Sequence, residues 1–314
     1  MTMAPPEPRE TVTKNGMRKL NRLLQRPDFR MNPLLALWRR FFWRFRWNVT
    51  QRPWIIPFWR SLRICLAKSG AGALIYYQGF SEPETADFIL RFLKPGMVFV
   101  DIGAHIGEYT LLGAHEVGLK GEVHAFEPHP SIFQILKQNI EFNGLTNVVL
   151  NNCAVCESER EREFELCAEA SVSSLKRNSV HSGVETTIIR TQSIRMDTYW
   201  EGRNKKIDLV KIDVEGAEML VFLGAEKLLN LARGEAPVWI FECSADNYTR
   251  FGYRPPDLFG LLQRYGYGIW RLSYTRQQLV EATPDFFPSA TMNLIAAKRE
   301  TGLRSVLRTR WSLQ

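Results

Sequence analysis

The chain has 314 residues, of which 45% are hydrophobic and 24% are charged, a composition typical of a globular protein. No stretch approaches the roughly 18 consecutive apolar residues that a membrane-spanning helix requires, and the N-terminus lacks the apolar core of a secretory signal. The cysteines are scattered and odd in number, so we expect reduced thiols and a cytoplasmic protein. They are Cys65, Cys153, Cys156, Cys167 and Cys243.

The net charge of +8 is distributed unevenly along the sequence. Thirteen Lys and Arg residues and one acid, Asp28, lie between Lys14 and Arg63, which gives this segment a charge of +12. The chain from Ile64 onward carries −3. The basic character therefore belongs to an N-terminal arm, and it does not predict an anionic ligand for the rest of the chain.

The segment Pro33–Trp47 predicts an amphipathic helix within this arm. At about 100° per residue, one broad apolar face collects six side chains. They are Leu34, Leu37, Trp38, Phe41, Phe42 and Phe45. Four arginines flank this face, namely Arg39, Arg40, Arg44 and Arg46, and two tryptophans, Trp43 and Trp47, lie on the other side.

Three roles for this helix follow from its composition. The apolar face is expected first to pack against the rest of the protein, second to bind an anionic membrane surface peripherally, and third to bind nucleic acid. Nucleic acid is therefore not the expected partner. Pro53 and Pro57 interrupt the helical pattern, which is expected to resume over residues 58–68.

Helix-like and strand-like segments alternate beyond residue 79. Strands are expected at 98–102, 122–126, 147–150, 207–212, 238–241, 267–272 and 292–297. Helices are expected at 84–93, 108–117, 131–143, 217–231 and 255–265, with an antiparallel insertion between 157 and 191. This order predicts an α/β fold with a mostly parallel, seven-stranded sheet covered by helices on both faces. The expected organisation is a basic arm at 1–79, one domain at 80–300 and a basic tail at 301–314.

A glycine loop follows the first of these strands, in the sequence Asp101-Ile-Gly103-Ala104-His-Ile-Gly107. Its G-x-x-x-G spacing differs from the G-x-G-x-x-G fingerprint that binds a pyrophosphate. An acid before the first glycine suits a ligand with a positive amino group. We therefore expect Asp101, Gly103, Ala104 and Gly107 to contact S-adenosyl-L-methionine.

The next two strands end in residues that suit the nucleoside part of the same ligand. Glu127 ends the second strand about twenty residues after the loop, where an acid can accept hydrogen bonds from both ribose hydroxyls. Asn152 and Ala154 follow the third strand and are expected to border the adenine.

A second motif, Lys211-Ile-Asp213-Val-Glu215-Gly-Ala-Glu218, ends the fourth strand. Ligands of such sheets bind at the carboxyl ends of the strands, so Asp213 and Glu215 should lie near the reactive end of the cofactor. Glu218 is explained by the positive N-terminus of the following helix. Asp213 and Glu242, at the ends of neighbouring strands, would permit a divalent ion, but two separated acids are a weak signal and no metal is expected.

The strand and glycine loop ending at Gly107, the Ala-Phe-Glu127-Pro sequence and the Lys211–Glu218 motif together resemble the FkbM family of S-adenosylmethionine-dependent methyltransferases. The resemblance runs from about residue 84 to residue 297 and leaves the arm unexplained. It implies a Rossmann-like class I methyltransferase fold and transfer of a methyl group to a hydroxyl, commonly of a sugar, glycan or secondary metabolite.

A poorly acidic hydroxyl is helped by a base within hydrogen-bond reach. The candidates are Asp213, Glu215 and His105, in that order. Two alternatives remain open at this stage. One is an RNA ribose methyltransferase that holds RNA with the basic arm, and the other is a non-catalytic, cofactor-binding protein at a membrane surface.

Overall fold

The structure is a computed structural model that describes residues 26–167, 175, 186–273, 278–282, 286–288 and 290–298. The described residues form two compact units. Residues 26–52 and 70–81 form the first, which we call the arm unit, and residues 53–69 with those from 82 onward form the second, the α/β unit. The division therefore differs from the expected boundary at residue 79, because residues 53–69 belong with the α/β unit. The expected tail at 301–314 lies outside the described residues.

The arm unit consists of α2 (Pro27–Met31), α3 (Pro33–Val49) and α4 (Gly70–Gln78). The helix predicted from Pro33 is thus present, and it begins where Asn32 Oδ1 accepts the backbone N–H of Leu35 at 3.0 Å. Trp43 and Trp47 are buried in this unit, whereas the predicted apolar face is exposed. Within the described part of the chain, no helix has both the length and the apolarity needed to cross a membrane.

An antiparallel hairpin, β1 (Trp54–Pro57) and β2 (Arg63–Leu66), opens the α/β unit. The helix expected over residues 58–68 was wrong. Isoleucines favour strands, and Pro57 removes a backbone donor that a continuing helix would need. The buried Asn139 fixes the hairpin, since its Oδ1 accepts the backbone N–H of Cys65 at 2.6 Å and its Nδ2 donates to the carbonyl oxygen of Ile106 at 2.7 Å.

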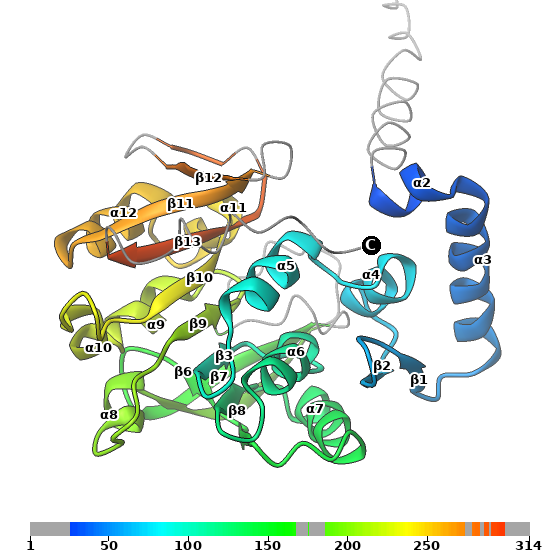
Figure 1. Ribbon diagram of the computed structural model, residues 1–314, viewed down its shortest axis with the longest axis horizontal. Helices are drawn as coiled ribbons and strands as arrows, with labels where there is room; N and C mark the ends of the chain where they lie inside the picture. Colours follow the sequence, from blue (N-terminus) through cyan, green and yellow to red (C-terminus); the bar gives the residue numbers. More distant parts are fainter. Residues whose placement is uncertain are drawn as a thin grey trace, which may run out of the picture. The chain divides into compact units, whose positions relative to one another are not determined.

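The large sheet has eight strands in the order β12-β11-β13-β10-β9-β3-β4-β5 (Figure 1). Strands β10, β9, β3, β4 and β5 are parallel, and β13 is antiparallel to both β10 and β11. The additional strand relative to the expected seven is β12, which pairs antiparallel with β11 at one edge. The bounds are β3 (Val98–Ile102), β4 (Glu122–Phe126), β5 (Val148–Asn151), β9 (Leu209–Ile212), β10 (Val238–Cys243), β11 (Tyr267–Ser273), β12 (Gln278–Glu281) and β13 (Met292–Lys298).

Helices cover both faces of this sheet (Figure 1). The sheet order changes direction at β3, so right-handed crossovers place α6 and α7 on one face and α9, α10 and α12 on the other. The bounds are α5 (Pro83–Phe92), α6 (Glu108–Val117), α7 (Pro130–Phe142), α8 (Met196–Trp200), α9 (Glu218–Leu223), α10 (Glu226–Asn230), α11 (Ala245–Arg250) and α12 (Pro255–Arg264). This is the expected Rossmann-like arrangement, and the sheet interior is apolar, with every residue of β3 and β10 buried.

Two local features differ in detail from the expectation. The helix expected over 217–231 is divided into α9 and α10 at Gly224, where a Cβ would lie only 2.0 Å from the carbonyl oxygen of Cys156. The antiparallel insertion is present as β7 (Arg160–Cys167) and β8 (Thr186–Ile194), and β6 (Ala154–Val155) adds to β8 to make a three-stranded sheet.

Candidate active site

The two sequence motifs meet where the sheet order reverses. Strands β3 and β9 are parallel neighbours, with Ile102 beside Ile212, so the residues that follow them lie at one edge of the sheet. Gly103 has φ +79°, and a Cβ on it would lie 1.9 Å from the carbonyl oxygen of Asp213. Such a switch point is where open α/β sheets bind their ligands. The structure therefore brings the predicted cofactor loop against the predicted catalytic segment.

The glycine loop is held by the neighbouring strand. The carbonyl oxygen of Phe126, at the end of β4, accepts the backbone N–H groups of Gly103 and Ala104, both at 2.9 Å. Gly107 has φ +92° and begins α6 without a side-chain cap. The N-terminal amides of α6 consequently point toward a ligand position with the partial positive charge that suits a carboxylate.

Asp101 is fully buried beneath this loop. Its Oδ2 accepts the hydroxyl of Thr110 at 2.6 Å, and its Oδ1 is a buried acceptor that no described residue satisfies. Burial raises the pKa of Asp101, and the charge of Lys211 opposes that effect. An acceptor left over in this position fits a cationic ligand group, which is the role predicted for Asp101.

Glu127 follows β4 and is oriented by two backbone groups. Its Oε2 accepts the N–H of His105 and its Oε1 accepts the N–H of His129, both at 2.8 Å. Burial raises its pKa to about 7. Each carboxylate oxygen has a second lone pair, so the fixed carboxylate can still accept hydrogen bonds from two hydroxyls. This geometry fits the predicted ribose site.

Cofactor binding should depend on pH because of Glu127. Hydroxyl donors favour the ionised carboxylate, so the affinity for S-adenosylhomocysteine should fall as the pH drops below about 7. Titration calorimetry between about pH 6 and pH 8 measures this change. Glu127→Gln should weaken binding by about tenfold or more and abolish the pH dependence, because the amide group cannot accept both backbone N–H groups. The exposed Glu141→Gln on α7 is the control, and an equal pH dependence in both variants would contradict the role of Glu127.

Lys211 and Asp213 form the charged centre of the site. Lys211 is 1% exposed, and its Nζ donates to Asp213 Oδ2 at 3.0 Å and lies 4.7 Å from the centre of the Tyr109 ring. Burial by itself lowers the pKa of Lys211, but the carboxylates of Asp213, Asp101 and Glu82 outweigh this effect and raise it. The lysine is therefore a permanent cation, and Asp213 remains 30% exposed beside it.

A second group of carboxyls lies beyond Asp213. Asn247 Nδ2 donates to Glu215 Oε2 at 3.0 Å and reaches Glu242 Oε2, at the end of β10, at 3.5 Å. Burial, and then the charge of Asp213, raises the pKa of Glu215 to about 8 and that of Glu242 well above its ordinary value. Both groups therefore carry protons at neutral pH and can donate as well as accept hydrogen bonds.

Glu218 and His105 have mainly structural environments. Glu218 is buried, and its Oε1 accepts the backbone N–H groups of Val214 and Gly216 at 3.1 and 3.4 Å, which fixes the loop after β9. His105 has φ +51°, and burial lowers the pKa of its imidazole to about 4. A neutral imidazole of such low basicity is a poor proton acceptor. Asp213 therefore precedes both Glu215 and His105 as the candidate base.

The raised carboxyl pKa values predict how stability changes with pH. Burial raises the pKa of Glu127 and Glu218 to about 7 and that of Glu215 to about 8, from 4.5 in the unfolded chain. Above pH 6.5, where histidines are neutral, the folded state binds more protons than the unfolded state. The stabilisation is therefore lost as the pH rises toward 8. The melting temperature of the unliganded protein should fall by roughly 5 °C or more between about pH 6.5 and pH 8.5, as measured by differential scanning fluorimetry.

The same scan of Glu215→Gln provides the comparison for this effect. Removing the titrating group should make the melting temperature less dependent on pH, because one proton-binding site of the folded state is lost. A wild-type melting temperature that stays constant or rises over this range would contradict the assignment.

The residues expected near the adenine lie on one side of Glu127. Asn152 Nδ2 donates to the carbonyl oxygen of Glu127 at 2.7 Å, so this side chain supports the ribose site through the backbone. Ala154 is 4% exposed in β6 and pairs with Ser193 of β8. Whether either residue contacts adenine stays a prediction.

Sequence reasoning missed four polar residues of the site. Tyr109 Oη donates to Glu82 Oε2 at 3.1 Å, and Asn293 Nδ2 donates to the same oxygen at 2.6 Å. Asn247 joins Glu215 to Glu242. Glu82 precedes α5 and Asn293 lies in the antiparallel β13, so neither belongs to a strand–loop motif, and only the alternation of β13 pointed to the position of Asn293.

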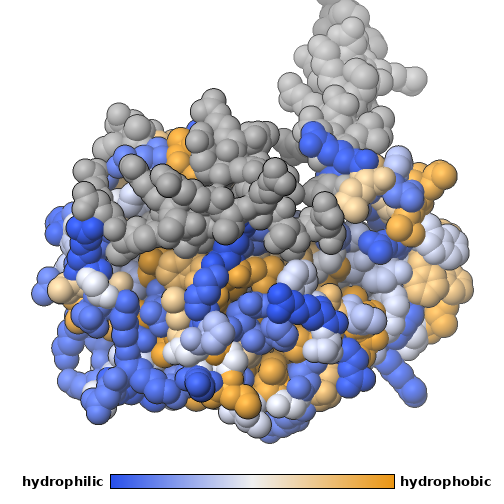
Figure 2. All heavy atoms as spheres, in the orientation of Figure 1, coloured by the Kyte–Doolittle hydropathy of each residue, from blue (hydrophilic) through white to orange (hydrophobic). Residues whose placement is uncertain are grey.

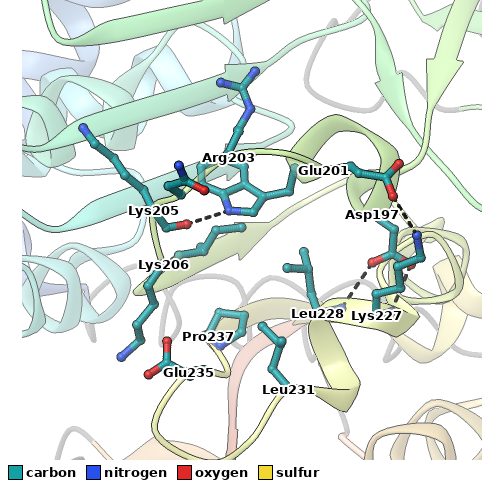
Figure 3. A pocket seen from close by; sticks show the side chains of 13 residues that line it. Asp197, Glu201, Arg203, Lys205, Lys206, Lys227, Leu228, Leu231, Glu235 and Pro237 are labelled. Carbon is teal, nitrogen blue, oxygen red and sulfur yellow. Dashed lines mark hydrogen bonds and ion pairs between the residues drawn. The ribbon is translucent and has the colours of Figure 1, made fainter.

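A separate hollow of about 380 Å³ lies at the opposite end of the sheet (Figure 3). Its lining includes Trp200, Lys206 and Pro237, which precede β9 and β10, and Lys227 on α10. These residues stand at the amino ends of the parallel strands. The hollow is therefore remote from the carboxyl ends, where the site residues gather.

The remaining sequence expectations concern metal and thiols. Among the described residues, no group of three His, Cys, Asp or Glu side chains is arranged to hold a metal ion. Cys65, Cys153, Cys156 and Cys243 are free thiols, as expected, whereas the side chain of Cys167 lies outside the described part. Burial raises the pKa of Cys153 to about 11 and that of Cys156 to about 12, so neither thiol is reactive at neutral pH.

The comparisons with known proteins agree with this geometry. The family model described as the methyltransferase FkbM domain matches residues 101–269. The chain is 26% identical to methyltransferase 1 of Beauveria bassiana over 144 residues, covering 40% of this chain and 57% of that protein. It is 28% identical to the 31-O-demethyl-FK506 methyltransferase FkbM of Streptomyces tacrolimicus over 165 residues, covering 43% of this chain and 61% of that protein. The match thus spans about three fifths of the length of each relative.

A solved structure with a similar fold is the S-adenosylmethionine-dependent O-methyltransferase of Thermotoga maritima. It has 15% sequence identity and a TM-score of 0.37, and the match covers 75% of this chain and 73% of that one. The family match includes both sequence motifs, from Asp101 through the Lys211–Glu218 segment. S-adenosyl-L-methionine is accordingly the cofactor, and the left-over acceptor of Asp101, the uncapped start of α6 and the oriented Glu127 fit its amino, carboxylate and ribose groups. The chain belongs to the FkbM family of methyltransferases.

Proposed function

We propose that this methyltransferase acts on a hydroxyl oxygen of a sugar, glycan or secondary metabolite, with Asp213 as the general base. The observation that supports this proposal is the position of Asp213. It is a partly exposed carboxylate fixed by a buried lysine at 3.0 Å, and its own carbonyl oxygen packs against the cofactor loop at Gly103.

The chain's residues divide the work in this proposal. The bound cofactor supplies a methyl group on a sulfonium, and the transfer needs an oxygen nucleophile aligned with it. Asp213 takes the proton from the acceptor hydroxyl as the oxygen–carbon bond forms. Lys211 holds the carboxylate in place, and the cation also balances the buried charge of Asp101.

The surroundings of Asp213 favour a neutral acceptor with several hydroxyls. Glu215, Glu242 and Asn247 offer donors and acceptors in fixed positions, and Glu82 with Asn293 offers more on the other side. Hydroxyl groups both donate and accept, so they match such a lining. Phosphates do not, because the lining is acidic and the sequence from Ile64 onward carries a net −3. This disfavours the alternative of RNA ribose methylation.

The decisive experiment uses the full chain with cofactor labelled in the methyl group and a cell extract separated into glycan, small-molecule, lipid, RNA and protein fractions. The label should enter the glycan or small-molecule fraction as an alkali-stable ether. Incorporation into RNA or protein would overturn the proposed acceptor class. Binding of a nicotinamide dinucleotide in preference to S-adenosylhomocysteine, measured by calorimetry, would overturn the methyl-transfer chemistry itself.

A further inference from the structure

The apolar face of α3 is exposed along its whole length. Leu34 is 79% exposed, Phe41 61% and Trp38 57%, and Leu37 and Phe45 are exposed as well. Neighbouring rings touch along this face, with Trp38 and Phe41 centroids 5.8 Å apart and Phe41 and Phe45 centroids 6.3 Å apart. Figure 2 shows hydrophobic side chains gathered over α3. A contiguous exposed patch of large apolar side chains marks an interaction surface.

The opposite side of α3 accounts for the folding of the arm unit. Trp43 stacks on Tyr76 with centroids 5.8 Å apart and meets Trp47 edge-on at 5.5 Å. Arg39 donates to the carbonyl oxygen of Tyr77 at 2.8 Å. The buried tryptophans, and not the broad apolar face, therefore hold α3 against α4. The face is left available for a partner.

The charges beside the face indicate what that partner is. On a helical wheel the exposed apolar side chains cover an arc of about 160°, with Arg44 at one edge and Arg46 and Arg39 at the other. Arg44 is exposed, as is Arg30 on α2. The sequence from Lys14 to Arg63 carries +12. An apolar arc that holds aromatic rings and has arginine at both edges is the pattern of a helix lying in the interface of an anionic bilayer.

We propose that α3 docks the protein on an anionic lipid surface, with Leu34, Trp38, Phe41 and Phe45 inserted among the acyl chains and Arg44 among the headgroups. A second copy of the chain is disfavoured as the occupant, because two faces with arginine at both edges would repel each other. RNA is disfavoured because leucine and phenylalanine side chains at the centre of the face offer nothing to a phosphate backbone. Lipid headgroups and acyl chains match both parts of the surface.

The test is co-sedimentation of the full chain with vesicles of phosphatidylcholine containing about one third phosphatidylserine, compared with vesicles of phosphatidylcholine alone. The protein should bind the anionic vesicles, and Phe41→Glu should weaken that binding by about tenfold or more. Arg44→Gln should weaken it by about fivefold and reduce its dependence on salt. The matched control is Leu119→Glu, which places the same charge at an 85% exposed leucine of the α/β unit and should leave binding unchanged.

A second measurement separates insertion from simple charge attraction. Brominated lipids quench a tryptophan that enters the acyl region, and Trp38→Leu should remove most of the quenched fluorescence while preserving vesicle binding. Three outcomes would overturn the proposal: no binding of the wild type to anionic vesicles, equal binding by Phe41→Glu and Leu119→Glu, or a dimer in solution that Phe41→Glu converts to a monomer without any vesicle binding by the wild type. Cofactor affinity is measured in parallel and should be the same in every variant, so the result stands apart from the acceptor proposal.

Discussion

Asp213→Asn is expected to reduce methyl transfer by about 10²- to 10⁴-fold, while affinity for S-adenosylhomocysteine changes by less than about threefold. The amide keeps the shape of the side chain, and its Oδ1 can still accept the hydrogen bond that Lys211 donates at 3.0 Å. The substitution therefore removes a proton acceptor and leaves the fold in place. Turnover is measured with the extract fraction that the wild type labels, and cofactor binding by calorimetry.

Asp246→Asn on α11 is the matched control, since Asp246 is exposed and undergoes the same chemical change. It should retain wild-type turnover. If Asp213→Asn also retained it, Asp213 would not be the base, and a loss of cofactor affinity equal to the loss of turnover would assign it to binding.

Gly103→Ala is expected to have the largest structural effect of any conservative substitution in the site. The added Cβ would lie 1.9 Å from the carbonyl oxygen of Asp213, which is backbone and has no rotamer with which to move away. The residue would also keep a left-handed φ of +79°. We expect unfolding to become easier by about 3 kcal/mol and cofactor affinity to fall by about 100-fold, because the loop and the segment after β9 must separate.

Gly144→Ala separates the two causes. Gly144 also has a left-handed φ, +64°, but a Cβ there meets nothing within 4 Å. It should lose only about 1 kcal/mol, without any change in cofactor affinity. Thermal melting and calorimetry compare the two variants, and similar losses in both would show that backbone strain, and not the close approach to Asp213, explains the effect.

The sequence was sufficient for those parts of the fold that repeat a local pattern. Strands β3, β4, β9 and β10 are apolar runs that end in acids, so their positions and the edge at which Asp101, Glu127 and Asp213 gather could be predicted. The hairpin at 54–66 could not, because it depends on the distant Asn139. The division between α9 and α10 likewise depends on the approach of Cys156 to Gly224, 68 residues apart in the sequence.

The candidate site was predictable to the same extent. Residues that follow strands in recognisable motifs were found, whereas Glu82, Tyr109 and Asn293 are brought in by tertiary packing. The charge states also required the structure. Burial separates the neutral His105 and the protonated Glu215 from the partly exposed Asp213, and three ionisable side chains within a motif look alike in the sequence.

Asn139 determines where the chain can be shortened. Its amide bonds both backbone groups of Cys65 in β2, at 2.6 and 3.3 Å, and the carbonyl oxygen of Ile106 in the cofactor loop at 2.7 Å. A truncated protein that starts at residue 80 would lose the hairpin and leave this buried amide without two of its three partners. A truncation that starts at Pro53 keeps all three. The N-terminal limit of a working catalytic fragment is therefore the hairpin, although the residues between its second strand and α5 belong to the arm unit.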